Sequence, residues 1–370
     1  MAGNAIVSDE LASKFATEKS TPYEAWVKAE GLDIISGHYV RNLRHVELKP
    51  WARRGGHGVF INHEGSRTSN DCYVCEIPMG GKLAPQRQLF EEMILILEGR
   101  GSTTVWNDAG QSITFEWKAG AIFAVPLNTW HQHFNGSGRE PARYVGVTFC
   151  PQVMNMFGEV DFVFNSKHDF KNRFNGEPDY FTNAGEQDGF LLRTNFVPDA
   201  VNLPLMSAKE RGAGGGHIRF NMARGAMASH ISQFPVGTYK KGHRHGPGAH
   251  VIVLSGEGYS LMWPENEEPK RYDWEIGTLI VPPNGWFHQH FNSGTAPARY
   301  LAFKHSTPRN AQGVPMSWIS RRIGGNQIDY ADESNTVRSM FSDALARHGL
   351  EPKMDSAYEA ELETLPPLPA

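Results

Sequence analysis

The chain has 370 residues, with 36 lysines and arginines against 40 aspartates and glutamates, and a formal net charge of −4. This length accommodates two or three domains, and the near balance of charge excludes the positive field that nucleic acid or an anionic membrane would require. No apolar run approaches the roughly 20 residues of a membrane span. The first residues lack the basic and apolar regions of a secretory signal. We therefore expect a cytoplasmic protein without nucleic-acid or membrane partners.

The chain contains three cysteines, Cys72, Cys75 and Cys150. The first two form a C-x-x-C pair, which can serve in redox chemistry or as half of a zinc site. They lie in a stretch that predicts a strand, where residues three apart point to opposite faces. No second cysteine pair exists to complete a zinc site, so we interpret the three as structural.

The composition changes along the chain in a way that predicts five segments. Two of them consist of short runs rich in Val, Ile, Phe and Tyr with Gly, Pro and Asn between the runs, which predicts strands. The ends carry polar stretches with helix-like spacing, and the last residues are rich in proline. In chain order we expect an N-terminal helical extension (1–45), a first β domain (46–154), a linker (155–207), a second β domain (208–308) and a C-terminal helical extension with a flexible tail (309–370).

The two β domains are copies of one another. When the chain is shifted by 157 residues, Gly99 falls on Gly256 and Trp117 on Trp274, without a gap between. The sequence HQHFN, which begins at His131, recurs at His288. A repeat of this kind indicates a duplicated domain. Short, evenly spaced strands with turn signals predict an all-β chain built of sandwiches or closed jelly rolls.

The second copy contains a cluster of five histidines. His243 and His245 alternate along one extended stretch, so their side chains share a face, and the same holds for His288 and His290. His250 begins the next apolar run. Convergent imidazoles suit first-row transition metals such as Fe, Mn, Ni, Cu and Zn. The pattern therefore predicts a metal site inside the second domain.

The first copy has lost most of these histidines. Gln86, Gln88 and Met93 stand at the positions of His243, His245 and His250. Amide oxygens are poor ligands for these metals compared with imidazole. We therefore expect the first domain to be free of metal and to serve packing.

The stretches GHRHGPGAHVIVLSGEG and GTLIVPPNGWFHQHFN resemble the two motifs of the cupin superfamily, and the repeat makes the chain similar to a bicupin. The second motif corresponds to Pro283, Gly285, His288 and Asn292. The resemblance implies two tandem cupin barrels, each a double-stranded β-helix or jelly roll. It implies His243, His245 and His288 as ligands, with His250 in the register of the family's usual glutamate, either as a fourth ligand or as a supporting residue.

Among bicupins, the chain resembles the gentisate and 1-hydroxy-2-naphthoate ring-cleaving dioxygenases. The resemblance is carried by the H-R-H of His243 to His245, by Ala249, and by the W-H-x-H that begins at Trp130. It implies one divalent metal per chain, Fe(II) in the first place and Mn(II), Ni(II), Cu(II) or Zn(II) as alternatives. It also implies dioxygen as a co-substrate and oxidative cleavage of a small, hydroxylated aromatic acid. Bicupins often self-associate, so we expect a homo-oligomer.

Four further residues are predicted to act on the substrate. His290, one pleat beyond His288, is a candidate general base or hydrogen-bond partner; since His133 persists in the copy that lost its ligands, a purely orienting role is the alternative. Trp286 and Phe234 are expected to form an apolar pocket, and Arg244 is a further candidate for substrate binding.

Two other functions fit the same residues. One is a non-oxidative metal-dependent enzyme, such as a decarboxylase, lyase or isomerase, that acts on a small carboxylate. The other is a non-catalytic binding bicupin, although proteins of that kind generally lose their ligands.

Overall fold

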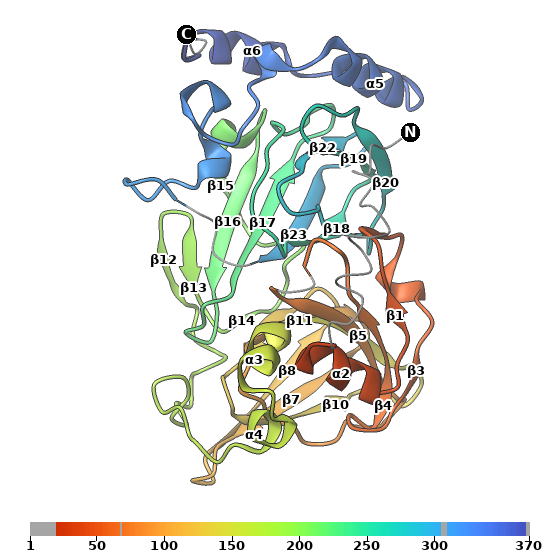
Figure 1. The fold of residues 1–370 in the computed structure, drawn as a ribbon, viewed down its shortest axis with the longest axis vertical. Helices are drawn as coiled ribbons and strands as arrows, with labels where there is room; N and C mark the ends of the chain where they lie inside the picture. Colours follow the sequence, from red (N-terminus) through yellow and green to blue (C-terminus); the bar gives the residue numbers. More distant parts are fainter. Residues whose placement is uncertain (1–19, 67–68, 305–308, 368–370) are drawn as a thin grey trace, which may run out of the picture.

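The computed structural model describes residues 20–66, 69–304 and 309–367. Its described strands form two large sheets and two three-stranded sheets, one pair for each half of the chain (Figure 1). The predicted N-terminal helical extension (1–45) lies partly outside the described residues. Within them it contains the helix α2, Pro22–Ala29, which begins with a capping box between Thr21 and Glu24.

The first half is built on one large and one small sheet. The large sheet has the order β1-β4-β5-β11-β6-β9-β14, with β3 paired to β4. These strands are β1 (Ile34–Ile35), β3 (Lys49–Trp51), β4 (Gly56–Ile61), β5 (Asp71–Ile77), β6 (Glu92–Glu98), β9 (Ile122–Val125), β11 (Ala142–Thr148) and β14 (Phe196–Val197). The small sheet is β10-β7-β8, made of β7 (Arg100–Trp106), β8 (Ser112–Lys118) and β10 (Trp130–Asn135).

The second half repeats this arrangement. Its large sheet has the order β12-β13-β16-β17-β23-β18-β21-β2, with β15 paired to β16. These strands are β2 (Tyr39–Val40), β12 (Glu186–Asp188), β13 (Leu191–Arg193), β15 (Met206–Ser207), β16 (Gly216–Asn221), β17 (Ala228–Phe234), β18 (His250–Ser255), β21 (Leu279–Ile280) and β23 (Ala298–Lys304). The small sheet is β20-β19-β22, made of β19 (Gly258–Trp263), β20 (Lys270–Trp274) and β22 (Phe287–Asn292).

The predicted fold class, all-β with two tandem jelly-roll barrels of the cupin type and short helical extensions, is confirmed by these strand orders. The order β5-β11-β6-β9 of the first half recurs as β17-β23-β18-β21, and β10-β7-β8 recurs as β22-β19-β20. One shared turn illustrates the repeat. The side-chain amide of Asn135 donates to the carbonyls of Ile77, Pro78 and Glu140, and that of Asn292 donates to the matching carbonyls in the second half.

Segments outside the repeats also supply strands, which the sequence patterns did not predict. The N-terminal segment adds β1 to the first half, beside β4, and β2 to the second half, beside β21. The linker adds β14 beside β9 and β13 beside β16. An exposed sheet edge presents unpaired backbone N–H and C=O groups, and covering it satisfies them. The N-terminal segment and the linker therefore join the two halves by backbone pairing.

The helices α5 and α6 lie across one end of the molecule, and the other helices lie on one face of the first half (Figure 1). The described α-helices besides α2 are α3 (Cys150–Phe157), α4 (Val160–Asn165), α5 (Asn335–Ala346) and α6 (Asp355–Leu362). Phe341 and Leu345 of α5 pack on Tyr239 and Phe291 of the second barrel. None of the described helices is long and apolar enough to cross a membrane.

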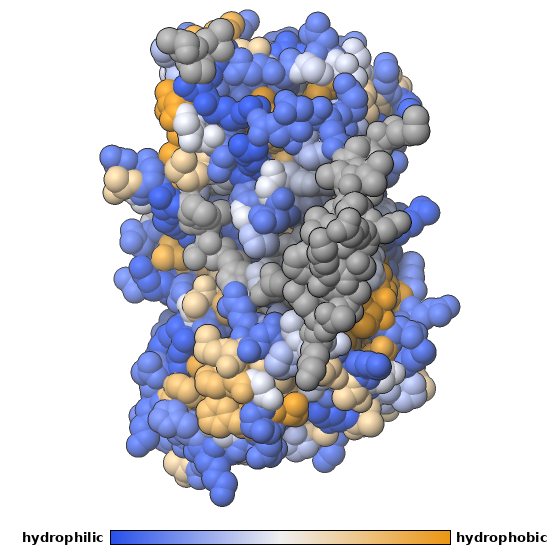
Figure 2. Space-filling view, viewed as in Figure 1, coloured by the Kyte–Doolittle hydropathy of each residue, from blue (hydrophilic) through white to orange (hydrophobic). Residues whose placement is uncertain are grey.

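Apolar and hydrophilic residues are unevenly distributed over the surface of the protein. In the view of Figure 2, apolar residues gather over α3 and α4, where Met156, Phe157 and Phe162 are exposed, while the end that carries α5 and α6 is largely hydrophilic. The three cysteines are buried and free.

The interior of the first barrel is held by a buried ion pair. The Arg54 guanidinium lies 3.3 Å from a carboxylate oxygen of Glu92 and donates to the hydroxyl of Tyr144. Tyr73 and Gln88 donate to the same carboxylate. Burial raises the pKa of the Glu92 carboxyl, but Arg54 and the other donors outweigh it, so the pKa lies below its usual value. Glu92 is therefore a carboxylate whose charge Arg54 compensates.

We expect Arg54→Met to lower the free energy of unfolding by about 3–5 kcal/mol, because it leaves the Glu92 carboxylate buried without a counter-charge. Urea titration at pH 7 measures the loss. Arg224→Met, which removes a largely exposed pair with Glu177, is the control and should cost about 0–1 kcal/mol. Removing both charges with Glu92→Gln should recover much of the loss, and equal losses for Arg54→Met and Arg224→Met would contradict the assignment.

Candidate metal centre

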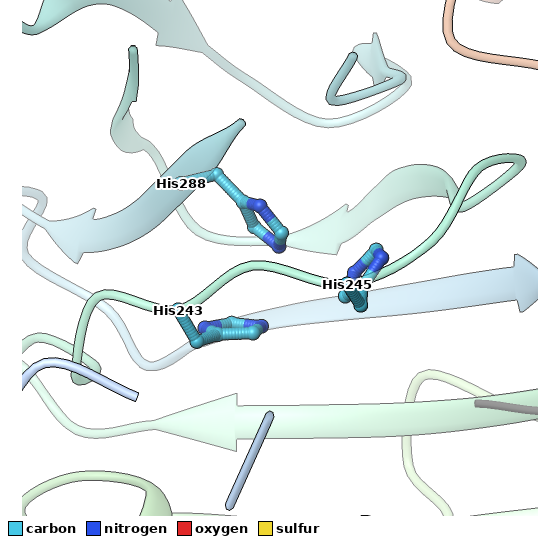
Figure 3. A group of neighbouring side chains, drawn as sticks. All are labelled: His243, His245 and His288. Atoms are coloured by element: carbon cyan, nitrogen blue, oxygen red, sulfur yellow. The ribbon is translucent and has the colours of Figure 1, made fainter. Parts of the chain in front are cut away.

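Three histidines converge inside the second barrel. His243 and His245 lie on the segment between β17 and β18, and His288 lies on β22. The segment is bound to the strand by two backbone hydrogen bonds, from His243 N to His288 O at 3.0 Å and from His288 N to His243 O at 2.8 Å. One ring nitrogen from each histidine lies within 4.8 Å of the others (Figure 3). Such a cluster has the donor type and the spacing that a divalent metal ion requires.

Backbone carbonyls orient all three rings. The Nδ1 atom lies 3.1 Å from Lys241 O in His243, 2.9 Å from Gly246 O in His245 and 3.4 Å from Trp286 O in His288. A carbonyl only accepts, so each Nδ1 is assigned the ring proton. The Nε2 lone pairs of His245 and His288 then face the site, while that of His243 accepts from Arg211, which a metal ion would replace.

The environment keeps these imidazoles neutral. Burial lowers the pKa of His243 and His288 well below the usual value, and neighbouring positive and imidazole groups lower it further. Burial, and then the charge of Lys304, lower the pKa of His245 to about 3. Neutral imidazole is the form that binds metal, so no proton has to be displaced near pH 7.

His250 lies outside this cluster. It pairs with Phe303 on β23, whereas its neighbour Val251 pairs with Ala302 and lines the cavity. Alternate residues of a strand face opposite sides, so the His250 side chain points away from the barrel interior. Its Nδ1 lies 3.2 Å from the side-chain amide of Asn70, which belongs to the first half. The structure thus places His250 at the junction of the two halves, and the inward position that precedes it is occupied by Ala249.

The first barrel keeps the backbone frame of the site but not its ligands. Gln86 and His131 exchange the same pair of backbone hydrogen bonds as His243 and His288. Glu92, which matches Ala249, points inward and pairs with Arg54. Among the described residues, the only group of histidine, cysteine and acidic side chains close enough to hold a metal ion is the one in the second barrel.

His290 is held by a hydrogen-bond relay. Trp274 Nε1 donates to Ser260 Oγ at 3.1 Å, and Ser260 Oγ lies 2.7 Å from His290 Nδ1. The Ser260 hydroxyl is fully buried and has one proton to donate, so we assign the proton to the bond with Nδ1. The ring proton of His290 is then on Nε2, and the residue lines the cavity as a hydrogen-bond donor.

The first barrel repeats this relay without a metal cluster. Trp117 Nε1 donates to Thr103 Oγ1 at 2.9 Å, and Thr103 Oγ1 lies 2.8 Å from His133 Nδ1. The relay is therefore part of the shared scaffold. In the second barrel the same scaffold aims His290 at the cavity that contains the three histidines.

The cavity is lined by basic and imidazole side chains. Three residues that the sequence patterns did not single out, Arg211, Arg219 and Lys304, share it with the histidine cluster. The remaining lining residues are His217, His230, Ser232, Ala249, Val251, His290, Tyr300, Ala302, Pro315, Ser317 and Trp318. No carboxylate stands among these described lining residues, so the charged groups of the lining are all basic.

Arg211 is the arginine nearest to the cluster. A guanidinium nitrogen lies 2.9 Å from His243 Nε2, and the group also donates to Ser317 O and Gln327 Oε1. Its backbone carbonyl accepts from Lys241 N, as that of Arg54 accepts from Ala84 N at the matching position of the first half. Arg211 and Arg54 are thus spatial counterparts. Sequence comparison misses this because the hairpin loop is four residues long in one copy (52–55) and longer in the other (208–215).

The predicted substrate-binding residues do not line the cavity. Phe234 is buried against Trp274 and Tyr300, and Trp286 contacts His38. Arg244 pairs with Glu265 at 2.6 Å at the surface. Each of the three has another packing or ion-pair role, and the expected aromatic pocket is replaced by a polar one.

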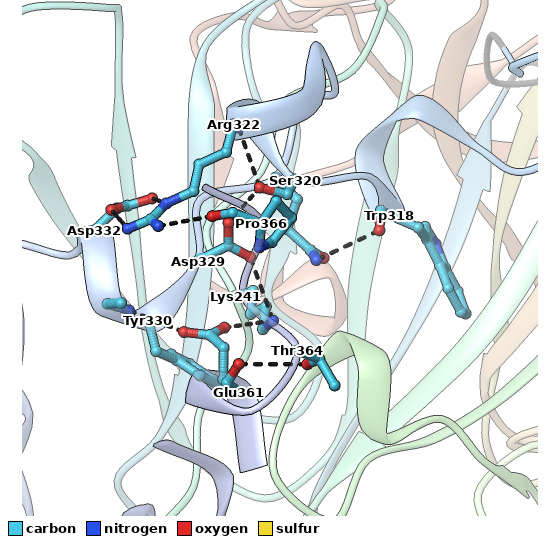
Figure 4. Close-up of polar contacts among 12 residues, drawn as sticks. Lys241, Trp318, Ser320, Arg322, Asp329, Tyr330, Asp332, Glu361, Thr364 and Pro366 are labelled. Atoms are coloured by element: carbon cyan, nitrogen blue, oxygen red, sulfur yellow. Dashed lines mark hydrogen bonds and ion pairs between the residues drawn. The ribbon is translucent and has the colours of Figure 1, made fainter. Parts of the chain in front are cut away.

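The C-terminal extension covers the barrel mouth. Pro315, Ser317 and Trp318 reach the cavity. The extension is fastened by polar contacts (Figure 4): Lys241 Nζ lies 2.5 Å from Glu361 and 3.5 Å from Asp329, and Arg322 pairs with Asp332. In this covered barrel His243 and His288 are buried, and His245 is half-buried.

Comparison with protein-family models finds no match, and neither does comparison with curated proteins. Among solved structures, a mutant of the oxalate decarboxylase of Bacillus subtilis aligns with 75% of this chain and 79% of its own, at 12% identity and a TM-score of 0.49. A deletion mutant of the same enzyme aligns with 74% and 78%, at 13% identity and a TM-score of 0.48. At TM-scores below 0.5 these matches support no conclusion about the activity of this chain.

We expect His243→Ala and His288→Ala each to lose most of the bound metal, because two imidazoles hold a divalent ion much less tightly than three. Metal analysis after dialysis of the purified protein against Mn(II) or Fe(II) measures this. Gln86→Ala, at the position of the first copy that matches His243, is one control. His250→Asn, at the junction of the two halves, is the other, and both variants should keep the bound metal. Equal loss from either control would place the site elsewhere.

We expect Ser260→Ala to lower the rate of substrate turnover at this site about tenfold, because His290 loses the hydroxyl group that orients it. The metal content of the protein should stay the same. Thr103→Ala makes the same change in the first barrel and should leave turnover unchanged. Loss of metal in Ser260→Ala would show that the relay supports the ligands instead.

Proposed function

We propose that the chain is a metal-dependent enzyme that holds one divalent transition metal on His243, His245 and His288 and acts on a small carboxylate. The observation that carries the proposal is the pairing of three neutral, converging imidazoles with a cavity wall of arginine and lysine. Neutral ligands leave the full charge of a divalent ion in the site, and the basic wall adds to it. An anion is the ligand that compensates this charge.

The donor set fits first-row divalent metals. Imidazole suits Fe(II), Mn(II), Ni(II), Cu(II) and Zn(II), and three protein ligands leave positions open for substrate oxygens. Fe(II), the metal that the sequence resemblance implies, stays one candidate beside Mn(II). When bound, the metal would polarise the substrate oxygens as a Lewis acid.

The residues of the chain have distinct roles in this proposal. Arg211, now hydrogen-bonded to His243, can turn its planar donors to a carboxylate, for which it offers bidentate geometry. His290 presents Nε2–H and can stabilise negative charge that develops on the substrate. The C-terminal cover, with Trp318 in the cavity wall, excludes water and so strengthens these interactions.

The cavity wall supports non-oxidative chemistry on a small carboxylate, such as decarboxylation, lysis or isomerisation. Phe234 and Trp286 pack elsewhere, so the apolar pocket expected for an aromatic substrate is lacking among the described lining residues. Oxidative cleavage of an aromatic hydroxy acid is the second candidate. It is supported by the three-histidine ligand set, which leaves room for both a bidentate substrate and dioxygen.

The test is turnover of a panel of small carboxylates and aromatic hydroxy acids by protein loaded with Mn(II) or Fe(II), with and without dioxygen. We expect product from a small carboxylate without oxygen consumption, and none from His288→Ala. Oxygen uptake with a ring-cleaved product would favour the dioxygenase. Metal and ligand binding without turnover would favour a binding protein, and absence of bound metal would overturn all metal-dependent functions.

A further inference from the structure

Two basic residues lie on the inner face of the large sheet of the second barrel. Strand pairing sets Arg219 of β16 opposite His230 of β17, which is itself opposite Ala302 of β23. Lys304, two residues beyond Ala302, therefore shares this face. Both Arg219 and Lys304 line the cavity that contains the histidine cluster.

These two charges have no counter-ion within the described part of the chain. No ion pair joins Arg219 or Lys304 to a carboxylate among the described residues, and Arg309 adds a third positive charge nearby. Burial, and then Arg211, Arg219 and Arg309, lower the pKa of Lys304 to about 7. Like charges held together beside a cavity carry an electrostatic cost that a bound anion removes.

The first barrel shows that the fold does not need these charges. By strand pairing, Phe60 stands opposite Tyr73 where Arg219 stands opposite His230. Thr148 likewise stands opposite Asp71 where Lys304 stands opposite Ala228. The barrel with the histidine cluster is thus the one that carries basic residues at both positions.

The basic groups are also divided between different parts of the cavity wall. Arg211 reaches the cluster from the loop 208–215 and lies beside His243. Arg219 and Lys304 project from the strands β16 and β23. A single carboxylate bound at the metal and Arg211 would leave the Arg219 and Lys304 charges uncompensated.

We propose that Arg219 and Lys304 form a second anion subsite and that the substrate is a dicarboxylate, with one carboxylate at the metal and Arg211 and the other at Arg219 and Lys304. This inference rests on the proposed function. The Arg219 guanidinium supplies a planar pair of donors and Lys304 a compact charge, a combination that suits a carboxylate.

The probes are two pairs of acids of equal carbon number, malonate against propionate and succinate against butyrate. Calorimetric titration of Mn(II)-loaded protein at pH 7 measures each affinity. We expect at least one dicarboxylate to bind about tenfold or more tightly than its monocarboxylate partner, as one charged hydrogen-bonded contact confers. Equal affinities within both pairs, or no binding of any of the four acids, would overturn the inference.

Variants locate the subsite. Arg219→Gln and Lys304→Gln should each remove most of the preference for the dicarboxylate. The affinity for the monocarboxylate and the Mn(II) content should stay nearly unchanged, which would exclude misfolding as the cause. Lys270→Gln, an exposed change on β20, is the matched control. Equal weakening of both acids by Arg219→Gln would show that the residue acts on the barrel as a whole, contrary to the proposal.

These measurements distinguish a failure of the anion subsite from a failure of the metal-dependent function. A protein that binds Mn(II) at the histidine cluster but shows no dicarboxylate preference contradicts the subsite and keeps the metal-dependent function. A protein that prefers the dicarboxylate through Arg219 and Lys304 but binds no metal contradicts the metal-dependent function and keeps the subsite.

Discussion

The candidate site depends on one backbone constraint, the two hydrogen bonds that His243 and His288 exchange. They bind the segment before β18 to strand β22 and so bring residues 45 positions apart into contact. Gln86 and His131 exchange the same two bonds in the first barrel. The frame is therefore a property of the fold, and the side chains placed on it decide whether the barrel can hold a metal ion.

The two barrels compensate buried charge in different ways. In the first, the Arg54 guanidinium faces Glu92 and two charges of opposite sign neutralise one another. In the second, Ala249 replaces the carboxylate and Arg211 reaches a histidine instead, while Arg219 and Lys304 add further positive charge. A closed ion pair makes an interior that needs no ligand. An interior with an excess of one sign is suited to bind a charged molecule, which is why the second barrel is the candidate for function.

Several predictions from sequence differ from the structure for reasons of geometry. The motif resemblance places His250 in the register of the glutamate that cupin motifs usually carry, but strand alternation turns its side chain towards Asn70 of the first half. Phe234 and Trp286 are aromatic residues near the site that pack into the protein rather than into the cavity. Proximity in sequence to a motif does not specify which side of the backbone a side chain occupies.

The sequence by itself determined the repeat and the all-β class, and it predicted His243, His245 and His288 as ligands with His250 left open, because glycine, tryptophan and alternating histidine patterns are local. Only the tertiary structure decided the cavity wall. Arg211 comes from a loop whose length differs between the copies, Lys304 from the end of a distant strand, and Trp318 from the C-terminal extension. Their meeting depends on long-range packing, for which one sequence carries no local signal.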